Sequence, residues 1–190
     1  MRDFDANPAR AQGPAEVWAG PVDAPTVVVL DPAGEAKHGE LPASWRELSQ
    51  RFQVVWCRLP VDHGQVSEVE DVFQELAEPG RTIDVVASGP IAQQALDLVA
   101  RHPGLVRKAL LVDPEGTGAT APPEATAFED ALWKERTLAL RRELAVAGTS
   151  VEVVAWSWGG DRDRVEPPLP LGHPDVVSQI ERALATPVSR

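Results

Sequence analysis

The sequence predicts an α/β protein: a three-layer domain in which a mostly parallel sheet of about six or seven strands carries helices on both faces. Short, continuous runs of β-branched residues, such as TVVVL at 26–30, are typical of strands buried on both faces. Segments with apolar residues at helical spacing separate these runs. This alternation implies right-handed crossovers between parallel strands.

The strand runs and the helical segments follow one another along the chain. Strands are expected at 15–19 (a short edge strand), 26–30, 52–57, 82–87, 106–112 and 151–156. Helices are expected at 42–50, after Ser67, at 90–101, from Thr126 to about Val146, and at 174–185. The Thr126 helix is expected to open with a capping box formed with Glu129. Residues 1–14 are polar and rich in Pro and Ala, so we expect a flexible arm before a single domain at 15–190.

The composition limits the kinds of molecule that the chain is expected to bind. The net charge of -11 argues against binding to nucleic acid or to an anionic membrane. No run approaches the apolar length of a membrane span, and residues 1–16 lack a signal-peptide core, so the default expectation is a cytoplasmic protein. The lone Cys57 lies in an apolar run and is expected to be a buried thiol. Neither a phosphate-binding glycine motif nor metal-ligand spacing occurs, so we expect no cofactor and no metal.

Four strings resemble, in order, segments of the α/β-hydrolase superfamily. VVVLDPAG resembles the strand and loop that supply the oxyanion hole, and SWRELSQRFQVVWCRLP resembles the helix and strand that follow. DVVASGPIAQQALDLVARHPGLVRKALLVDP resembles the nucleophile elbow, its helix and the next strand, and VEVVAWSWGGDRDRV resembles the strand before the catalytic acid. The resemblance covers roughly 15–184. It implies the superfamily's fold, with the cap domain reduced to one helix at about 126–146.

The elbow can be aligned with the family's G-x-S-x-G turn in two registers. If Ser88 is the nucleophile, Val86 and Pro90 stand where small residues are needed. If Gly89 holds that position, Ala87 is the small neighbour, and glycine adopts the required positive φ without strain. Pro90 then takes the first helical position, which it favours. The Gly89 register is preferred. It leaves no nucleophile, and Pro90 has no N–H for an oxyanion.

The loop after the strand at 26–30 also departs from the family. Asp31-Pro32 stands where His-Gly is common. Asp31 is either an acid, base or ligand contact, or a loop carboxylate that caps the turn. Ala33 lies in the same loop and is expected, with Asp31 and Gly89, to border a binding site.

The resemblance also implies an acid and a base. Asp163 matches the acidic position, with Asp161 as a rival, and His173 resembles the family's Gly-His. The last helix begins directly after His173, so this residue is either a retained base or a histidine at a helix start. Trp158 is expected to line a pocket. Ser157 lies in a serine-elbow-like string, but no helical pattern follows it.

Two functions follow from these alternatives. The first is a non-hydrolytic protein that binds a small molecule or supports assembly, or an atypical non-covalent enzyme. The alternative is a small serine esterase or thioesterase that uses Ser88, Asp163 and His173 in the family's order. The small cap leaves the carboxyl edge of the sheet open. That edge is therefore the expected place for a small-molecule ligand or for the partner subunit of a homodimer.

Overall fold

The computed structural model describes residues 14–36, 39–59, 69–116, 121–160 and 165–187. Six strands within these ranges form one sheet in the order β1-β3-β2-β4-β5-β6. β1 runs antiparallel to β3, and the other neighbours are parallel. The strands are β1 Glu16–Ala19, β2 Thr26–Asp31, β3 Gln53–Arg58, β4 Ile83–Ser88, β5 Val106–Val112 and β6 Ser150–Ala155. The predicted fold class is confirmed. The predicted arm, apart from its last residue, lies outside the described residues.

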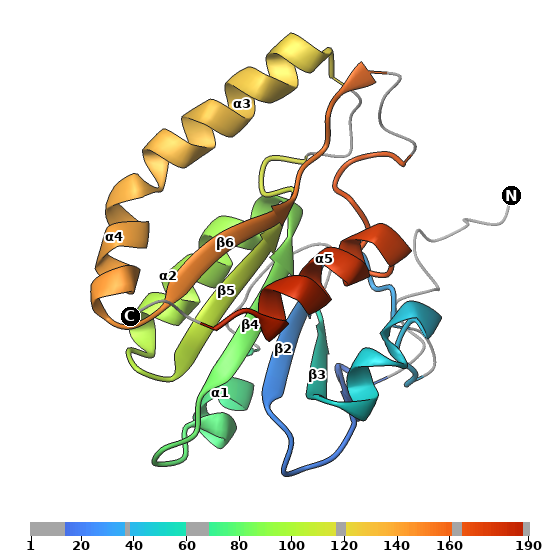
Figure 1. Cartoon of the computed structure of the whole chain (residues 1–190), viewed down its shortest axis with the longest axis vertical. Coiled ribbons are helices and arrows are strands. Elements are labelled where there is room, and N and C mark those ends of the chain that lie inside the picture. Colours follow the sequence, from blue (N-terminus) through green and yellow to red (C-terminus); the bar gives the residue numbers. More distant parts are fainter. Residues whose placement is uncertain (1–13, 37–38, 60–68, 117–120, 161–164, 188–190) are drawn as a thin grey trace, which may run out of the picture.

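Helices cover both faces of the sheet (Figure 1). The α-helices are α1 Glu70–Leu76, α2 Ala92–Arg101, α3 Pro123–Arg136, α4 Leu138–Val146 and α5 Pro174–Ala185. Three short 3₁₀ turns are η1 Ala43–Trp45, η2 Leu48–Gln50 and η4 Gly89–Ile91. The helix predicted at 42–50 is therefore two 3₁₀ turns instead. α1, α2 and α4 pack on one face, and α5 packs with η1 and η2 on the other.

The long helix predicted from Thr126 begins three residues earlier and is divided. α3 starts at Pro123, and Thr137 separates it from α4. The predicted capping box is therefore wrong: Thr126 lies inside the helix, and its hydroxyl donates to the carbonyl oxygen of Pro122 at 3.3 Å. Proline at the first helical position needs no N–H partner, which explains the earlier start.

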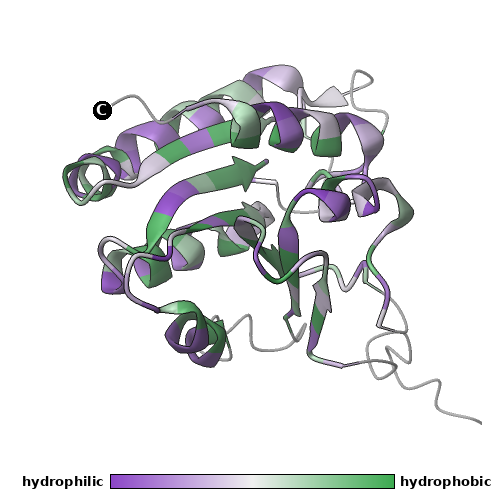
Figure 2. Ribbon diagram, turned by 60° about the horizontal axis from the view of Figure 1, so that its bottom comes forward, coloured by the Kyte–Doolittle hydropathy of each residue, from purple (hydrophilic) through white to green (hydrophobic). Residues whose placement is uncertain are grey.

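The core consists of two apolar layers on either side of β2. Val28 and Leu30 face α1 and α2, whereas Val27 and Val29 face α5. All six β2 residues are buried. Burial on both faces explains why the strand reads as a continuous apolar run, and Figure 2 shows hydrophobic residues concentrated in the strands. Cys57 is buried as predicted, and burial raises the pKa of its thiol to about 12.

A buried lysine fixes the carboxyl end of α5 to the sheet. Lys108 on β5 is fully buried, and its Nζ donates to the carbonyl oxygens of Ala183 and Thr186. The last carbonyls of a helix have no partner within the helix, and a cation there also complements the helix dipole. The contact fixes the position of α5, whose opposite end borders the candidate site.

Candidate functional site

The backbone at the turn after β4 distinguishes the two registers that were considered for the elbow. Ser88 is the last strand residue, with an extended backbone at φ -126° and ψ 152°. Gly89 has a φ of +62° and is the residue in the left-handed region. The positive φ that the family's nucleophile adopts therefore belongs to Gly89. Ser88 is only 3% exposed and lies one residue before the turn.

The space in front of Gly89 is occupied by another loop. A Cβ atom added to Gly89 would lie 3.0 Å from both Cβ and Cγ of Pro168 and 3.4 Å from the carbonyl oxygen of Gly116. Such contacts are tighter than normal van der Waals distances. A side chain at the elbow would point into the Pro168 ring. Pro90 follows and has no N–H, so the backbone donor that normally faces an oxyanion is absent there.

Asp113, at the end of β5, holds the loops that close over the elbow. Its backbone has a φ of +48°, and its side chain is buried. Oδ1 accepts from the backbone N–H of Ser157 at 3.1 Å, and Oδ2 accepts from that of Leu169 at 3.2 Å. A Cβ atom on Gly116 would lie 2.4 Å from Asp113 Oδ2, so only glycine fits there. Asp113 therefore holds Leu169 and, beside it, the Pro168 ring.

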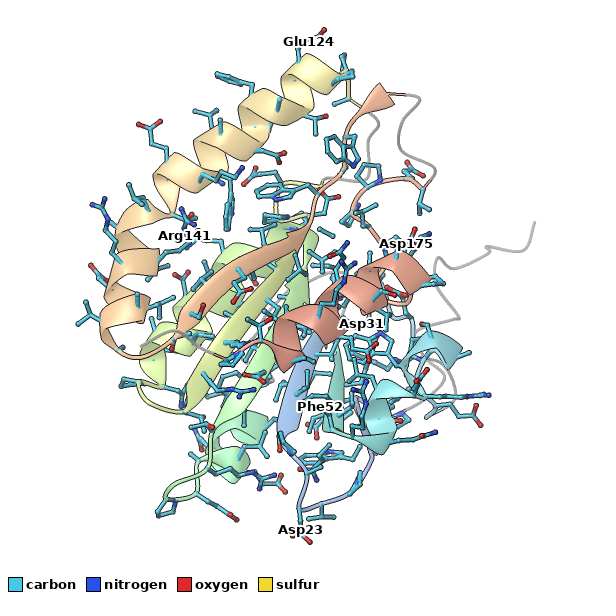
Figure 3. All side chains as sticks on the ribbon, in the orientation of Figure 1. Asp23, Asp31, Phe52, Glu124, Arg141 and Asp175 are labelled. Carbon is cyan, nitrogen blue, oxygen red and sulfur yellow. The ribbon has the colours of Figure 1, made fainter. Side chains whose placement is uncertain are left out.

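The loop after β2 is organised around a buried carboxylate. Asp31 is 0% exposed and lies at the carboxyl end of β2 (Figure 3). Its side chain accepts from the indole Nε1 of Trp56 at 2.7 Å. It also accepts four backbone N–H groups, those of Ala33, Gly34, Glu35 and Ala36. These bonds fit the capping role that the sequence left open for Asp31. The side chain of Ala33 is exposed.

Glu35 joins that loop to the start of α5. Its two carboxylate oxygens accept from the backbone N–H groups of Leu171 and Gly172, each at 2.7 Å. Burial is the main cause that raises the pKa of Glu35, and the charge of Asp31 adds to it. These two contacts join residues that are separated by 136 and 137 positions in the chain. They fix the segment that leads into His173.

Of the three predicted triad residues, the structure describes Ser88 and His173, and no hydrogen bond joins these two. His173 is the N-cap of α5, and its Nδ1 accepts from the backbone N–H of Asp175 at 3.3 Å. That bond leaves the proton of a neutral imidazole on Nε2. His173 lines a cleft to which neither Ser88 nor Gly89 contributes. Asp163 and its rival Asp161 lie outside the described residues.

The cleft opens at the end of β6, two strands away from the elbow strand. Its volume is about 810 Å³. One wall comes from α3, the floor from the last residues of β6 and the segment after it, and the other wall from the start of α5, where Figure 3 labels Asp175. The predicted pocket residue Trp158 lines it, together with Trp156, His173, Asp130 and Lys134.

Two charged side chains of α3 give the cleft its electrostatic character. The pKa of Asp130 is raised from 3.8 to about 6, mainly by burial and then by the charge of Asp113, while Lys134 opposes the shift and Glu115 adds to it. The Nζ of Lys134 lies 4.4 Å from the centre of the Trp156 ring. Sequence reasoning missed Asp130 and Lys134. The signal that could have found them is their spacing of four, which places both on one side of a helix.

The comparisons with known proteins concern the fold. No protein-family model and no curated protein sequence matches the chain. Among solved structures, it is similar to a thermostable esterase (14% identity, TM-score 0.49, covering 90% of this chain and 56% of the other). It is also similar to the carboxylesterase CesB (YbfK) from Bacillus subtilis (16% identity, TM-score 0.40, covering 87% of this chain and 56% of the other). A third similar structure is an enol-lactonase from Burkholderia xenovorans LB400 (15% identity, TM-score 0.34, covering 70% of this chain and 63% of the other). The chain spans little more than half the length of these structures.

The fold class that the resemblance implied is confirmed. The sheet and the helices on its two faces are the elements that the resemblance implied, from the edge strand β1 to α5. No described helix is long and apolar enough to cross a membrane. Among the described residues, no group of three or more acidic, histidine or cysteine side chains could hold a metal ion. The small-molecule ligand and the homodimer stay predictions.

Proposed function

We propose that this chain is a non-hydrolytic protein that binds a small molecule in the cleft between α3, β6 and α5. The observation that carries the proposal is the elbow. Gly89 has the left-handed backbone, and the Pro168 ring lies where a nucleophile's side chain would project. Covalent catalysis needs a nucleophile at that point with a base within hydrogen-bond reach.

Two further features support a binding role over hydrolysis. The Asp31 carboxylate already accepts five N–H groups, so its lone pairs are committed to the loop instead of to a substrate. The open cleft lies elsewhere and has a volume within the range of small-molecule sites. Its lining combines aromatic rings with a few charged groups, which is the usual composition of such sites.

A fluorophosphonate probe tests the proposal directly. Such probes label activated serines, so we expect no labelling of the purified chain and no turnover of p-nitrophenyl acetate or butyrate above the buffer rate. A known serine esterase, run in parallel, controls for probe quality. Ser88→Ala and Ser157→Ala are the matched variants.

Labelling that disappears in Ser88→Ala would overturn the proposal in favour of an esterase that uses Ser88, Asp163 and His173. Labelling that disappears only in Ser157→Ala would also overturn it, since an activated serine would then lie at the end of β6. Ester turnover that either substitution abolishes carries the same meaning.

A further inference from the structure

The charges that line the cleft favour a cationic ligand. Asp130 and Asp175 carry carboxylates on its walls, and the basic side chains among the described lining residues are Lys134 and His173. Asp113 is buried behind the cleft, and its charge and that of Glu115 help to raise the pKa of Asp130. A carboxylate that is held near other acids becomes more stable when a cation approaches. The chain's net charge of -11 attracts cations over a longer range.

The cleft also presents an aromatic surface that already accommodates a cation. The Nζ of Lys134 lies 4.4 Å from the centre of the Trp156 ring, within the range of a cation–π contact. Trp133 packs edge-on against Trp156, with ring centroids 6.1 Å apart and an interplanar angle of 77°. Because Trp133 is buried, this contact fixes the orientation of the Trp156 ring. Trp158 adds a second indole to the same cleft and is 66% exposed.

We propose that the cleft binds an organic cation: an amine or quaternary ammonium group attached to an apolar body. The cationic group lies between the Asp130 carboxylate and the face of Trp156, where it replaces the ammonium of Lys134. The flexible Lys134 side chain moves into solvent. The apolar body contacts Val154, Leu169 and Val176, which line the same cleft. This ligand class rests on the proposed binding function, because it assumes that the cleft and not the elbow is the working site.

A set of three probes of similar size tests the sign of the ligand's charge. Benzyltrimethylammonium is the cation, phenylacetate the anion and benzyl alcohol the neutral control, each titrated into the full chain by isothermal calorimetry. We expect the cation to bind at least about tenfold more tightly than either of the others, since only it gains from both the carboxylate and the indole face. The indole fluorescence of the chain provides an independent readout.

Four variants test the position of the cation. Asp130→Asn and Trp156→Leu are each expected to weaken binding of benzyltrimethylammonium by about three- to tenfold. Lys134→Met is expected to tighten it by about threefold, because the variant removes the competing ammonium. Glu129→Gln is the matched control. Glu129 is exposed beside Asp130 but does not line the cleft, so the affinity stays unchanged. Thermal melts establish that each variant is folded.

Three results would overturn the ligand class: no binding of the cation, binding of phenylacetate that is equally tight or tighter, or cation binding that Asp130→Asn and Trp156→Leu leave unchanged. If any of these results is obtained and the fluorophosphonate probe labels no serine, the organic cation is rejected as the ligand class and the proposed binding function is retained. Serine labelling by the fluorophosphonate probe removes the binding function itself, whatever the calorimetry gives. The two failures are therefore distinguishable.

Discussion

Asp31 and Asp130 are two carboxylates of the same domain, one at the end of β2 and one on α3, and their surroundings are opposite. Asp31 is fully buried and accepts five N–H groups. Asp130 is half-buried and lies near the acids Asp113 and Glu115, and its pKa rises to about 6. The first carboxylate is fully satisfied within the fold, whereas the second is destabilised in its charged form by the fold.

The same contrast distinguishes the two regions around these residues. At the elbow, the Pro168 ring and the Gly116 carbonyl oxygen lie close to Gly89. Around β6, the space between α3 and α5 stays open. Groups whose charges are satisfied internally stabilise a structure, while destabilised charges that face a cleft are typical of binding sites. Under the proposed function, the elbow therefore belongs to the structural scaffold and the cleft is the binding site.

The largest expected effect comes from removing the satisfied carboxylate. Asp31→Ala leaves four backbone N–H groups and one indole N–H without their acceptor, several of them buried. We expect a loss of about 3–4 kcal/mol in the free energy of unfolding, measured by urea denaturation. Asp23→Ala, in an exposed loop, is the matched control and should change stability by no more than about 0.5 kcal/mol. Similar small losses in both variants would contradict the structural role of Asp31.

The second effect tests whether the elbow is closed. Gly89→Ala requires a side chain in the left-handed region and also brings a Cβ atom to 3.0 Å from the Pro168 ring. Gly104→Ala is the control: Gly104 has a φ of +80°, but nothing lies within 4 Å of its added Cβ. We expect a loss of about 2–3 kcal/mol at Gly89 and about 1–2 kcal/mol at Gly104, in the same urea assay. Equal losses would mean that Pro168 yields easily and that the elbow region is not closed.

Most of the fold could be predicted because its signals are local. Each strand was placed within one residue of its observed bounds. The central strands β2, β3 and β4 read as nearly unbroken apolar runs because they are buried on both faces. The left-handed position at Gly89 was also predictable, because only glycine adopts that backbone without strain and proline favours the next position. The start of α3 at Pro123 was missed because the predicted capping box placed the first residues of the helix at Thr126.

The contacts that close the elbow and form the cleft could not be predicted, since they join segments far apart in the chain. Pro168 meets Gly89 across 79 positions, and Glu35 binds Leu171 across 136. No local pattern encodes such contacts. The raised pKa of Asp130 likewise depends on Asp113, which another loop brings near. An acidic residue in an exposed-looking helix gives no sign of this in the sequence.

The smallest expected effect comes from replacing Asp130, and this substitution is expected to raise the stability of the chain instead of lowering it. Its pKa in the folded chain, about 6, lies above the ordinary value of 3.8. Between these values the folded state binds more protons than the unfolded state, so this group's contribution to stability is present at low pH and is lost as the pH rises through about 6. Asp130→Asn removes that loss. The free energy of unfolding of the variant should equal that of the parent chain near pH 4 and exceed it at pH 7.5.

The expected gain at pH 7.5 is about 0.5–1 kcal/mol, or a Tm higher by about 1–4 °C, because water screens a half-exposed carboxylate and reduces the effect of the shift. Thermal melts at pH 4, 5.5 and 7.5 measure it, with Glu129→Gln as the control that should show no pH-dependent difference. A gain that is the same at every pH, or a loss, would contradict the account. Asp130 is thus expected to lower the stability of the chain when the cleft is empty and to strengthen binding when a cation is present. Such a trade-off between stability and binding is typical of binding sites. Benzyltrimethylammonium should therefore stabilise the parent chain more than the Asp130→Asn variant in the same melts.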